Sequence, residues 1–240
     1  MRIFKTDIPE HIIEFIVATV QEKKELQHFS ETAICRHLEY ILKRDKKARE
    51  TLSTVNDLQK LRKNKVFTNI IKQLRDIARR IYGVYITKDY TKKEELLLQG
   101  RIEDLLKLHV STKERIEHYD EVYKALITET CAPQSVLDLA CGLNPAAKKF
   151  ITDEPIDYIA SDIAEQDITF LNELLQRPEY GNESFAFRSD LTDPEDIARL
   201  SQHKTDWCLL FKALDPIEEI TENITYDLID AIASKWIIVS

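Results

Sequence analysis

Glycine is scarce in this chain, which gives weight to the one glycine that follows a buried strand. The 240 residues contain only four glycines, where average usage of about 7% would give roughly 17. Gly142 lies in the stretch SVLDLACGLNPAA, residues 135–147, after an apolar run and before Asn144 and Pro145. Such a run between turn residues predicts a buried parallel strand that ends in a tight turn. We expect Gly142 to have a positive φ or to lie against a ligand.

A second predicted strand, residues 156–161, ends at Asp162. An acid about 20 residues after a glycine-bearing turn binds the ribose hydroxyls in Rossmann-type nucleotide sites. The turn is not GxGxxG, because Ala140 and Ala146 stand where glycines would be needed, and this disfavours a pyrophosphate. A nucleoside ligand without phosphates fits better, and S-adenosylmethionine (SAM) is the common one. The alternative is an ordinary strand, turn and helix with one glycine.

Composition narrows the class of protein. The chain has no apolar run long enough for a transmembrane helix, and its N-terminus, MRIFKTDIPE, lacks the apolar stretch of a signal peptide. The four cysteines have no metal-ligand spacing. We therefore expect a cytoplasmic protein with reduced thiols and no metal.

The net charge of −8 hides an asymmetry between the two ends of the chain. Residues 1–110 hold 23 Lys and Arg against 16 Asp and Glu, whereas residues 111–240 hold 11 against 26. A basic half joined to an acidic half suggests a polyanion-binding module attached to an enzyme domain. The alternative is a set of solvated, lysine-rich helix faces.

Helical patterns dominate the first hundred residues. Ser30 is a predicted N-cap, and a long amphipathic helix is predicted over residues 64–82, with Gly83 as the residue that ends it. The polar face of this helix is nearly all cationic, as a surface that follows RNA phosphates would be. The candidate RNA-binding residues are Lys65, Lys72, Arg75, Arg79 and Arg80.

The segment HVSTKER, residues 109–115, contains a predicted capping box formed by Ser111 and Glu114. The free N–H groups of the helix that it starts, together with Arg115, would hold the carboxylate of the methionine part of SAM. The alternative is a well-capped helix with a surface arginine.

From Ser135 onward strands and helices alternate, which predicts an open, mainly parallel α/β sheet with its ligand at the carboxyl ends of the strands. Asp190 and Leu191 follow the third strand, where adenine would lie, and Phe211 and Lys212 end the fourth and face the same crevice. Strands are predicted near 135–140, 156–161, 184–188, 206–211 and 235–240, and helices near 145–152, 164–176, 194–202 and 216–233.

The segments HVSTKER, VLDLACGLNP and DWCLLFKAL, with RRIYGVYIT at residues 79–87, resemble the aminoglycoside-resistance 16S rRNA (guanine-1405-N7) methyltransferases over about residues 65–240. The resemblance implies an all-helical rRNA-binding domain, residues 1–108, followed by a Rossmann-like class I SAM-dependent methyltransferase domain, residues 109–240. It also implies SAM as cofactor, 16S rRNA within the 30S subunit as partner, no membrane, and a monomer. The implied cofactor-binding residues are His109, Val110, Ser111, Arg115, Ala140, Gly142, Asp162, Asp190, Leu191 and Phe211.

The chain departs from that family at two places. Family members have a proline directly after Lys-x-Leu, where this chain has Asp215 followed by Pro216. They also continue beyond the position of Ser240 with a flexible loop and two further strands, so the C-terminal strands of the sheet are expected to be missing.

The resemblance implies methyl transfer to guanine N7, which carries a free lone pair and needs no general base. No catalytic residue is therefore expected, although Lys212 would either touch the RNA or be structural. The expected activity confers aminoglycoside resistance. The alternatives are a non-catalytic RNA-binding protein with a methyltransferase-like domain, and a small-molecule methyltransferase, which the basic half of the chain disfavours.

Overall fold

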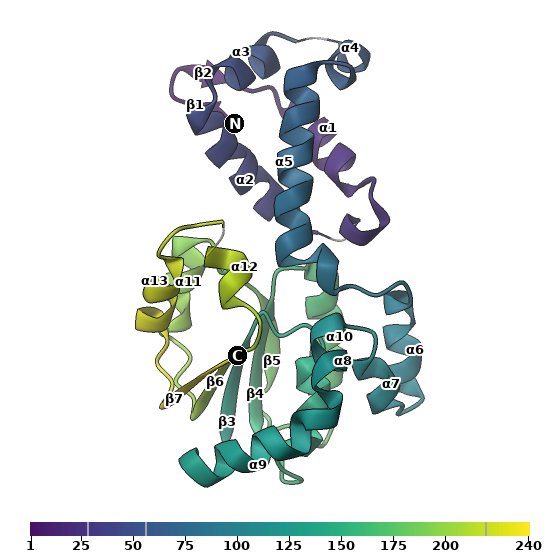
Figure 1. The fold of residues 1–240 in the computed structure, drawn as a ribbon, viewed down its shortest axis with the longest axis vertical. Coiled ribbons are helices and arrows are strands. Elements are labelled where there is room, and N and C mark those ends of the chain that lie inside the picture. Colours follow the sequence, from purple (N-terminus) through teal and green to yellow (C-terminus); the bar gives the residue numbers. More distant parts are fainter. Residues whose placement is uncertain (28, 56, 219) are drawn as a thin grey trace. The chain divides into compact units, whose positions relative to one another are not determined.

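A computed structural model describes residues 1–27, 29–55, 57–218 and 220–240 (Figure 1). These residues form two compact units, Met1–Gly83 and Val84–Ser240. Within the described ranges, no helix is both long and apolar enough to cross a membrane.

The N-terminal unit consists mostly of helices. It opens with a short antiparallel hairpin in which Arg2 pairs with Asp7. The prediction that this unit consists of helices alone misses this hairpin. Its elements are β1 (Arg2–Ile3), β2 (Thr6–Asp7), α1 (Glu10–Gln21), η1 (Lys24–Leu26), α2 (Glu31–Arg44), α3 (Lys46–Thr54), α4 (Leu58–Arg62) and α5 (Lys65–Ile81).

Helix α5 is the central helix of this unit and confirms the long helix predicted over residues 64–82. It packs against α1, α2 and α3. Ser30 caps α2 as predicted, because its hydroxyl accepts a hydrogen bond from the Ala33 N–H. The residues that α5 buries are Phe67, Ile70, Ile71, Leu74 and Ala78.

Gly83 does not end α5 in the way predicted. Tyr82 is the C-terminal cap residue, and Gly83 lacks the positive φ of a left-handed helix end. A Cβ at position 83 would lie 3.0 Å from Leu26 Cδ2. Glycine at this position therefore permits close packing of the chain against η1.

The second unit is built on a five-stranded sheet with the order β5-β4-β3-β6-β7, and every neighbouring pair is parallel. The five strands confirm those predicted from the sequence. From Gly83 onward the elements are η2 (Gly83–Tyr85), which spans the boundary between the units, η3 (Tyr90–Lys92), α6 (Lys93–Leu98), α7 (Ile102–Leu106), α8 (Val110–Arg115), η4 (Ile116–His118), α9 (Tyr119–Thr130), β3 (Ser135–Leu139), η5 (Asn144–Phe150), β4 (Asp157–Asp162), α10 (Glu165–Leu175), β5 (Phe185–Arg188), α11 (Pro194–Leu200), β6 (Trp207–Leu210), α12 (Leu214–Glu218), α13 (Ile224–Ala231) and β7 (Trp236–Val239).

Helices cover both faces of the sheet (Figure 1). Successive residues of a strand point to opposite faces, so Val136 belongs to the core cluster that includes side chains of α6, α7, α9 and α10, whereas Leu137 belongs to the cluster that includes side chains of α11, α12 and α13. Because both faces are buried, the strand β3 reads as a nearly continuous apolar run, as is typical of parallel sheets. The predicted α/β class is confirmed.

Two predicted helices differ in the structure. The helix predicted over 145–152 is the 3-10 helix η5, and the helix predicted over 216–233 is replaced by two helices, α12 and α13. Residue 219, which falls within the second prediction, lies outside the described residues.

The compact units divide 25 residues before the domain boundary predicted at 108/109. Apolar side chains of α6 and α7, including Leu97 and Leu105, belong to the same core cluster as Val136 of the sheet. Residues 84–108 are therefore part of the second unit, because their apolar faces are buried against it.

A buried ion pair joins α6 to α10. The Lys93 ammonium donates a hydrogen bond to the Asp167 carboxylate, and the two side chains are only 8% and 4% exposed. The Lys93 Nζ also lies 4.6 Å from the centre of the Tyr90 ring. Breaking such a pair from one side leaves a buried charge without its partner.

We predict that Lys93→Met lowers the free energy of unfolding by about 3–5 kcal/mol. The double variant Lys93→Met with Asp167→Leu should recover much of that loss, because no isolated charge remains buried. Lys149→Met is the control, since its ion pair with Glu103 is 3.5 Å long between side chains 48% and 65% exposed, and it should cost about 0–1 kcal/mol. Urea unfolding of the wild-type protein and the three variants measures these values, and equal losses for Lys93→Met and Lys149→Met would contradict the prediction.

Candidate functional site

The carboxyl ends of four parallel strands bring together residues that are far apart in the sequence. Ala140 follows β3, Asp162 ends β4, Asp190 lies just after β5, and Phe211 follows β6. Ala140 is exposed, whereas Asp162, Asp190 and Phe211 are buried. In open α/β sheets this edge is where ligands bind.

The turn after β3 is tied to the end of β4. The Gly142 N–H donates to Asp162 Oδ2 over 2.8 Å, and the Ile163 N–H donates to Asp162 Oδ1 over 2.7 Å. Burial raises the pKa of Asp162 to about 6, assisted by the charge of Asp167, while the backbone hydrogen bonds act in the opposite direction. The spacing that singled out Asp162 thus corresponds to a direct contact with the glycine turn.

Gly142 meets the first of the two expectations, a positive φ, and a protein side chain fills the space beside it. Its φ is +53°, and a Cβ at this position would lie 2.6 Å from Cε1 of His109. Ala140, two residues earlier, also has a positive φ, of 49°. No side chain larger than hydrogen fits at 142 while the His109 ring stays in place.

His109 is buried beside this turn, immediately before α8. Burial, together with the charge of Arg115, lowers its pKa to about 3, so the ring is neutral near pH 7. It stacks on Tyr85 with 5.6 Å between the ring centres, and its buried Nδ1 has no hydrogen-bond partner within the described residues. His109 therefore offers an uncharged polar edge at the turn.

Helix α8 differs from the helix predicted from HVSTKER. It spans Val110–Arg115 with His109 as its cap residue and no side-chain cap, so the predicted capping box of Ser111 with Glu114 is wrong. The Ser111 hydroxyl instead accepts a hydrogen bond from Arg115 Nη1 over 2.8 Å. A helix of six residues has a small macrodipole, which leaves Arg115 as the main candidate for holding a carboxylate. Val110 is half-buried at its first position.

Arg115 is held between α8 and the end of β6. Its Nη2 lies 3.4 Å from Asn144 Oδ1, and its guanidinium carbon lies 4.8 Å from the centre of the Phe211 ring. Its Nε is buried without a hydrogen-bond partner among the described residues. The side chain is thus oriented by its neighbours and retains an unused donor.

A buried polar network, which the sequence pattern did not single out, lies below Arg115. Asp138 in β3 accepts hydrogen bonds from Asn144 Nδ2 over 2.8 Å and from the Tyr158 hydroxyl over 2.6 Å. The Tyr119 hydroxyl donates to Asn144 Oδ1 over 2.8 Å. Burial raises the pKa of Asp138 to about 6. An aspartate within an otherwise apolar strand was the available signal in the sequence.

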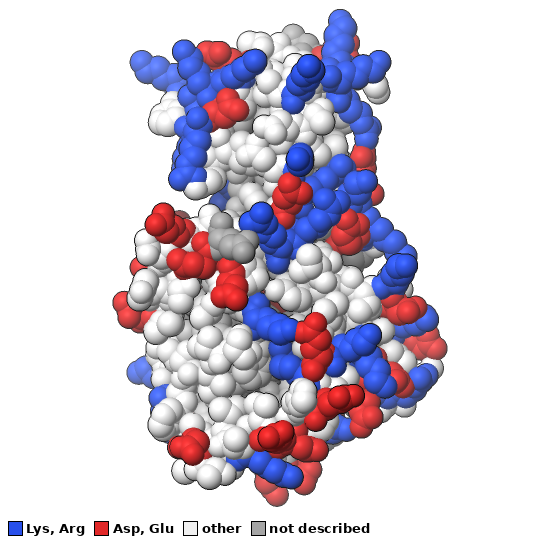
Figure 2. All heavy atoms as spheres, in the orientation of Figure 1, with Lys and Arg blue, Asp and Glu red and all other residues white. Residues whose placement is uncertain are grey.

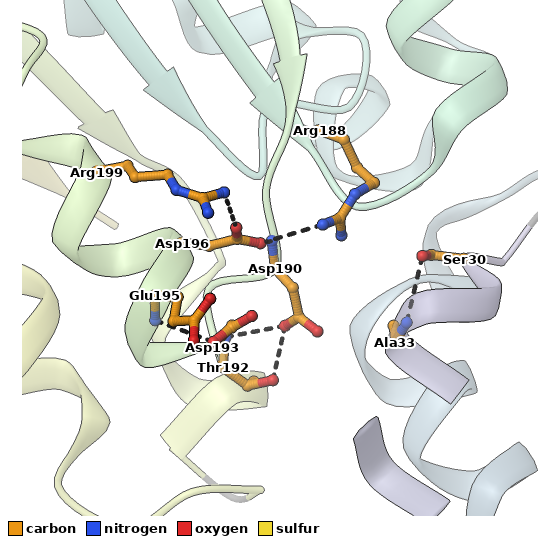
Figure 3. A network of polar contacts seen from close by, with 9 residues as sticks. All are labelled: Ser30, Ala33, Arg188, Asp190, Thr192, Asp193, Glu195, Asp196 and Arg199. Carbon is orange, nitrogen blue, oxygen red and sulfur yellow. Dashed lines mark hydrogen bonds and ion pairs between the residues drawn. The ribbon is translucent and has the colours of Figure 1, made fainter. Parts of the chain in front are cut away.

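The loop after β5 carries Asp190 and Leu191, both of which are buried. Asp190 Oδ1 accepts hydrogen bonds from the Thr192 N–H over 2.9 Å and from the Thr192 hydroxyl over 2.6 Å (Figure 3). Asp193 caps α11 by accepting from the Glu195 N–H, as the Asp-Pro pair predicted. The loop is therefore closed by its own hydrogen bonds.

Lys212 lies at the rim of the same edge and is exposed. Its φ is +56°, its N–H donates to the Ser240 carbonyl over 2.8 Å, and its ammonium pairs with the Glu114 carboxylate. The Tyr85 hydroxyl donates to the Lys212 carbonyl over 3.3 Å. The side chain is thus held beside α8.

The candidate RNA-binding residues of α5 fall into two groups. Lys65, Lys72 and Arg80 are exposed, whereas Arg75 and Arg79 are half-buried. The Arg75 guanidinium donates to the Thr19 carbonyl and lies 3.4 Å from Glu22, and Arg79 Nε donates to Glu25 over 3.0 Å. The two arginines are partly neutralised within the N-terminal unit.

A cavity of about 350 Å³ lies between α1 and α5 in the N-terminal unit. Its floor includes Phe67 and Ile71, and its charged lining consists of Lys23, Arg62, Lys72, Arg75 and Arg79 with Glu22 and Asp76. Figure 2 shows Lys and Arg side chains over much of the visible face of this unit. Cations outnumber carboxylates around the cavity.

Comparison with known proteins places this chain in a family. Residues 45–240 match the family model described as ribosomal RNA methyltransferase (FmrO). The chain is 34% identical over 137 residues to a 16S rRNA (guanine(1405)-N(7))-methyltransferase of Micromonospora rosea, which covers 56% of this chain and 47% of the relative. It is 35% identical over 138 residues to a protein of the same name from Micromonospora echinospora, covering 56% and 47%. The chain spans about half the length of these curated relatives.

Solved structures share the fold. The 16S rRNA methyltransferase RmtF in complex with S-adenosyl-L-homocysteine superimposes with a TM-score of 0.69 at 20% identity, covering 94% of this chain and 79% of the other. An rRNA methylase from Escherichia coli gives a TM-score of 0.65 at 21% identity, covering 92% and 80%. The family match covers most of the chain and confirms the resemblance drawn from its short segments: the chain belongs to the ribosomal RNA methyltransferase (FmrO) family.

Proposed function

We propose that this protein uses SAM to methylate N7 of a guanine in 16S rRNA, in the decoding site of the 30S subunit, and that it thereby confers aminoglycoside resistance in the cytoplasm. The observation that carries the proposal is the junction of Gly142 with Asp162 beside His109. The names of the curated relatives support the substrate.

The residues of the crevice fit a nucleoside ligand. Because Gly142 carries no side chain, the neutral His109 ring can lie directly against the turn at the edge of the crevice. The Asp162 carboxylate interacts with the backbone N–H groups of Gly142, Ile163 and Ala164, and a carboxylate accepts about four hydrogen bonds, which leaves capacity for a ribose hydroxyl. Buried Asp190 and Leu191 would border the adenine. The set proposed to bind SAM is His109, Val110, Ser111, Arg115, Ala140, Gly142, Asp162, Asp190, Leu191 and Phe211.

Arg115 would orient the methionine end of the cofactor. Its unused Nε and its contacts to Ser111 and Asn144 present a pre-oriented guanidinium, which suits a carboxylate better than a flexible lysine does. The Phe211 ring beneath the guanidinium excludes water from one side. These contacts restrict the position of the ligand before the reaction begins.

The proposed chemistry requires alignment more than acid–base catalysis. When bound, SAM supplies a methyl group on a sulfonium sulfur. Guanine N7 has a lone pair and no proton to lose, so the protein has to hold this atom in line with the methyl group and exclude water. His109, neutral and buried, adds no positive charge next to a cationic cofactor. Lys212 at the rim would contact the RNA.

The test of the function is methyl transfer from labelled SAM to 30S subunits, with naked 16S rRNA and free guanosine as controls. We expect label only in the 30S sample, at one guanine that becomes sensitive to reduction and aniline cleavage, as N7-methylguanosine is. Binding of SAM and 30S without transfer would support a non-catalytic RNA-binding protein. Methylation of guanosine alone would support a small-molecule enzyme.

We predict that Asp162→Asn weakens SAM binding by about 1.5–3 kcal/mol, as for hydrogen bonds that involve a charged group. Asp157→Asn, at the amino end of the same strand, is the matched control and should leave the affinity unchanged. Calorimetry at pH 8 measures both, and equal affinities for the two variants would contradict the assignment.

The raised pKa of Asp162 predicts the direction of a pH effect. The ionised carboxylate is the better acceptor for ribose hydroxyls, so SAM affinity should be highest well above pH 6, where Asp162 is ionised, and should fall as the pH drops through about 6. Asp162→Asn should have a flatter profile, in which any remaining dependence comes from Asp138, whose pKa is also about 6. Identical profiles for the wild-type protein and the variant would contradict the role.

We predict that the exposed lysines of α5 bind rRNA phosphates. Lys65→Glu with Lys72→Glu should weaken 30S binding and flatten the plot of log affinity against log salt by about 1.4–1.8, because each lost phosphate contact contributes about 0.7–0.9. Lys124→Glu with Lys204→Glu makes the same charge change at exposed positions of the second unit and should leave the slope unchanged. SAM affinity should be the same in all variants. If both pairs give equal slopes, α5 does not hold the RNA.

A further inference from the structure

The hairpin near the N-terminus exposes an aromatic ring to which the proposed function gives no role. β1 and β2 are joined by Phe4 and Lys5 alone. Phe4 is 69% exposed and has a φ of +54°. The first position of such a turn favours glycine when its φ is positive, and a bulky residue there is strained. An exposed ring also gains little from folding, so stability does not explain a phenylalanine at this position.

The hairpin holds the ring in a fixed place. Ile3 and Ile8, on the two sides of the turn, are each only 2% exposed. The Ile8 N–H donates to the Met1 carbonyl over 2.8 Å. Strand β1 packs against α2 and strand β2 packs against α3 (Figure 1). The turn is therefore anchored on both sides, and Phe4 is presented from a rigid base.

A guanidinium lies over the Phe4 ring. The guanidinium carbon of Arg49 is 5.0 Å from the centre of the ring. Its Nη1 donates to the Lys43 carbonyl over 3.2 Å and also to the Leu42 carbonyl, because the last carbonyls of α2 have no partner within the helix. The end of α2 thus fixes Arg49, which supports the ring from one side by a cation–π contact while most of the ring stays open.

The surroundings of the ring are cationic. Arg2, which lies 3.9 Å from Asp7, and Lys5 are both exposed. The unit Met1–Gly83 contains 18 Lys and Arg against 11 Asp and Glu. An exposed ring among cations suits unpaired RNA, whose bases stack on aromatic side chains while its phosphates lie near the positive charges. Charged neighbours do not suit an apolar pocket of a partner protein.

We propose that Phe4 binds an unpaired base of 16S rRNA by stacking on it with the open face of its ring. This inference rests on the proposed function, which supplies the RNA, and it adds a base contact to the phosphate contacts proposed for α5. The hairpin lies outside residues 45–240, which match the family model. Stacking tolerates every base, so the contact increases affinity without selecting a sequence.

Binding of the whole chain to 30S subunits across a salt series tests the inference. Phe4→Asn removes the ring, and asparagine tolerates a positive φ, so the midpoint of urea unfolding should not fall. The affinity for 30S should drop by about 5- to 150-fold, the factor that one stacked base supplies. The slope of log affinity against log salt should stay the same, because no charge is lost. Tyr226→Asn, at a 72% exposed position of α13, is the matched control and should leave the affinity unchanged.

Three further variants separate stacking from apolar contact. Phe4→Leu keeps an apolar side chain without a π face, and it should weaken 30S binding nearly as much as Phe4→Asn. Phe4→Trp has a larger π face and should bind at least as tightly as the wild-type protein. The photoreactive residue p-benzoylphenylalanine in place of Phe4 should cross-link to 16S rRNA when the complex with 30S is irradiated.

The outcomes are distinct. Wild-type affinity in both Phe4→Asn and Phe4→Leu overturns the inference. A cross-link to a ribosomal protein, or wild-type binding by Phe4→Leu with weak binding by Phe4→Trp, shows an apolar protein pocket and also overturns it. A lower urea midpoint in every Phe4 variant shows that the ring stabilises the fold, which overturns the role in binding. A wild-type protein that does not bind 30S contradicts the proposed function, and this inference with it.

Discussion

The hydrogen bond from the Gly142 N–H to the Asp162 carboxylate is the contact around which the edge of the sheet is arranged. It forms only because residue 142 has a positive φ and no side chain, which leaves room for the His109 ring. It also requires β3 and β4 to be parallel and in register, so that the Cys141 N–H reaches the Ser161 carbonyl over 2.9 Å. A change in any one of these three conditions would move the carboxylate away from the crevice.

Burial shifts the pKa values of the acidic groups and of the histidine near this contact in opposite directions. Asp138 and Asp162 lose hydration, which raises the pKa of each to about 6, and fixed donors compensate for that loss. His109 also loses hydration, and its pKa falls to about 3. The crevice therefore combines acceptors that ionise near neutral pH with a ring that stays uncharged, and this combination suits a ligand that carries hydroxyl groups and a positive charge.

The sequence predicted those features that depend on neighbouring residues. The five strands were visible because buried parallel strands are short apolar runs between turn residues, and Ser30 and Asp193 were visible as caps because their partners lie within three residues. The unit boundary was not predictable, because the helical spacing of Leu97 and Leu105 shows that they are buried but not against which element. The pairing of Arg75 with Glu22 depends on packing between α1 and α5, which local periodicity does not specify.

At the candidate site, separation along the sequence does not by itself decide which predictions are correct. The spacing of Gly142 and Asp162 predicted a contact that the structure contains. The capping box failed because the Ser111 hydroxyl binds Arg115 in place of a backbone N–H. Asp138 and Asn144 could not be assigned from the sequence, because their hydrogen bonds involve Tyr119 and Tyr158 from two other elements.

The strand order has a consequence for how the chain folds. β3 pairs with β4 and β4 pairs with β5, each with the next strand in the sequence, whereas β6 must return to the far side of β3, where Trp207 pairs with Val136. Contacts between residues close in sequence form faster than contacts between distant ones. The half of the crevice that holds Gly142, Asp162 and Asp190 is thus expected to assemble while β6 is still unpaired, and Phe211 is expected to reach Arg115 only in the last stage. During synthesis the part of the crevice proposed to hold the nucleoside would take shape before the part proposed to hold the methionine is closed.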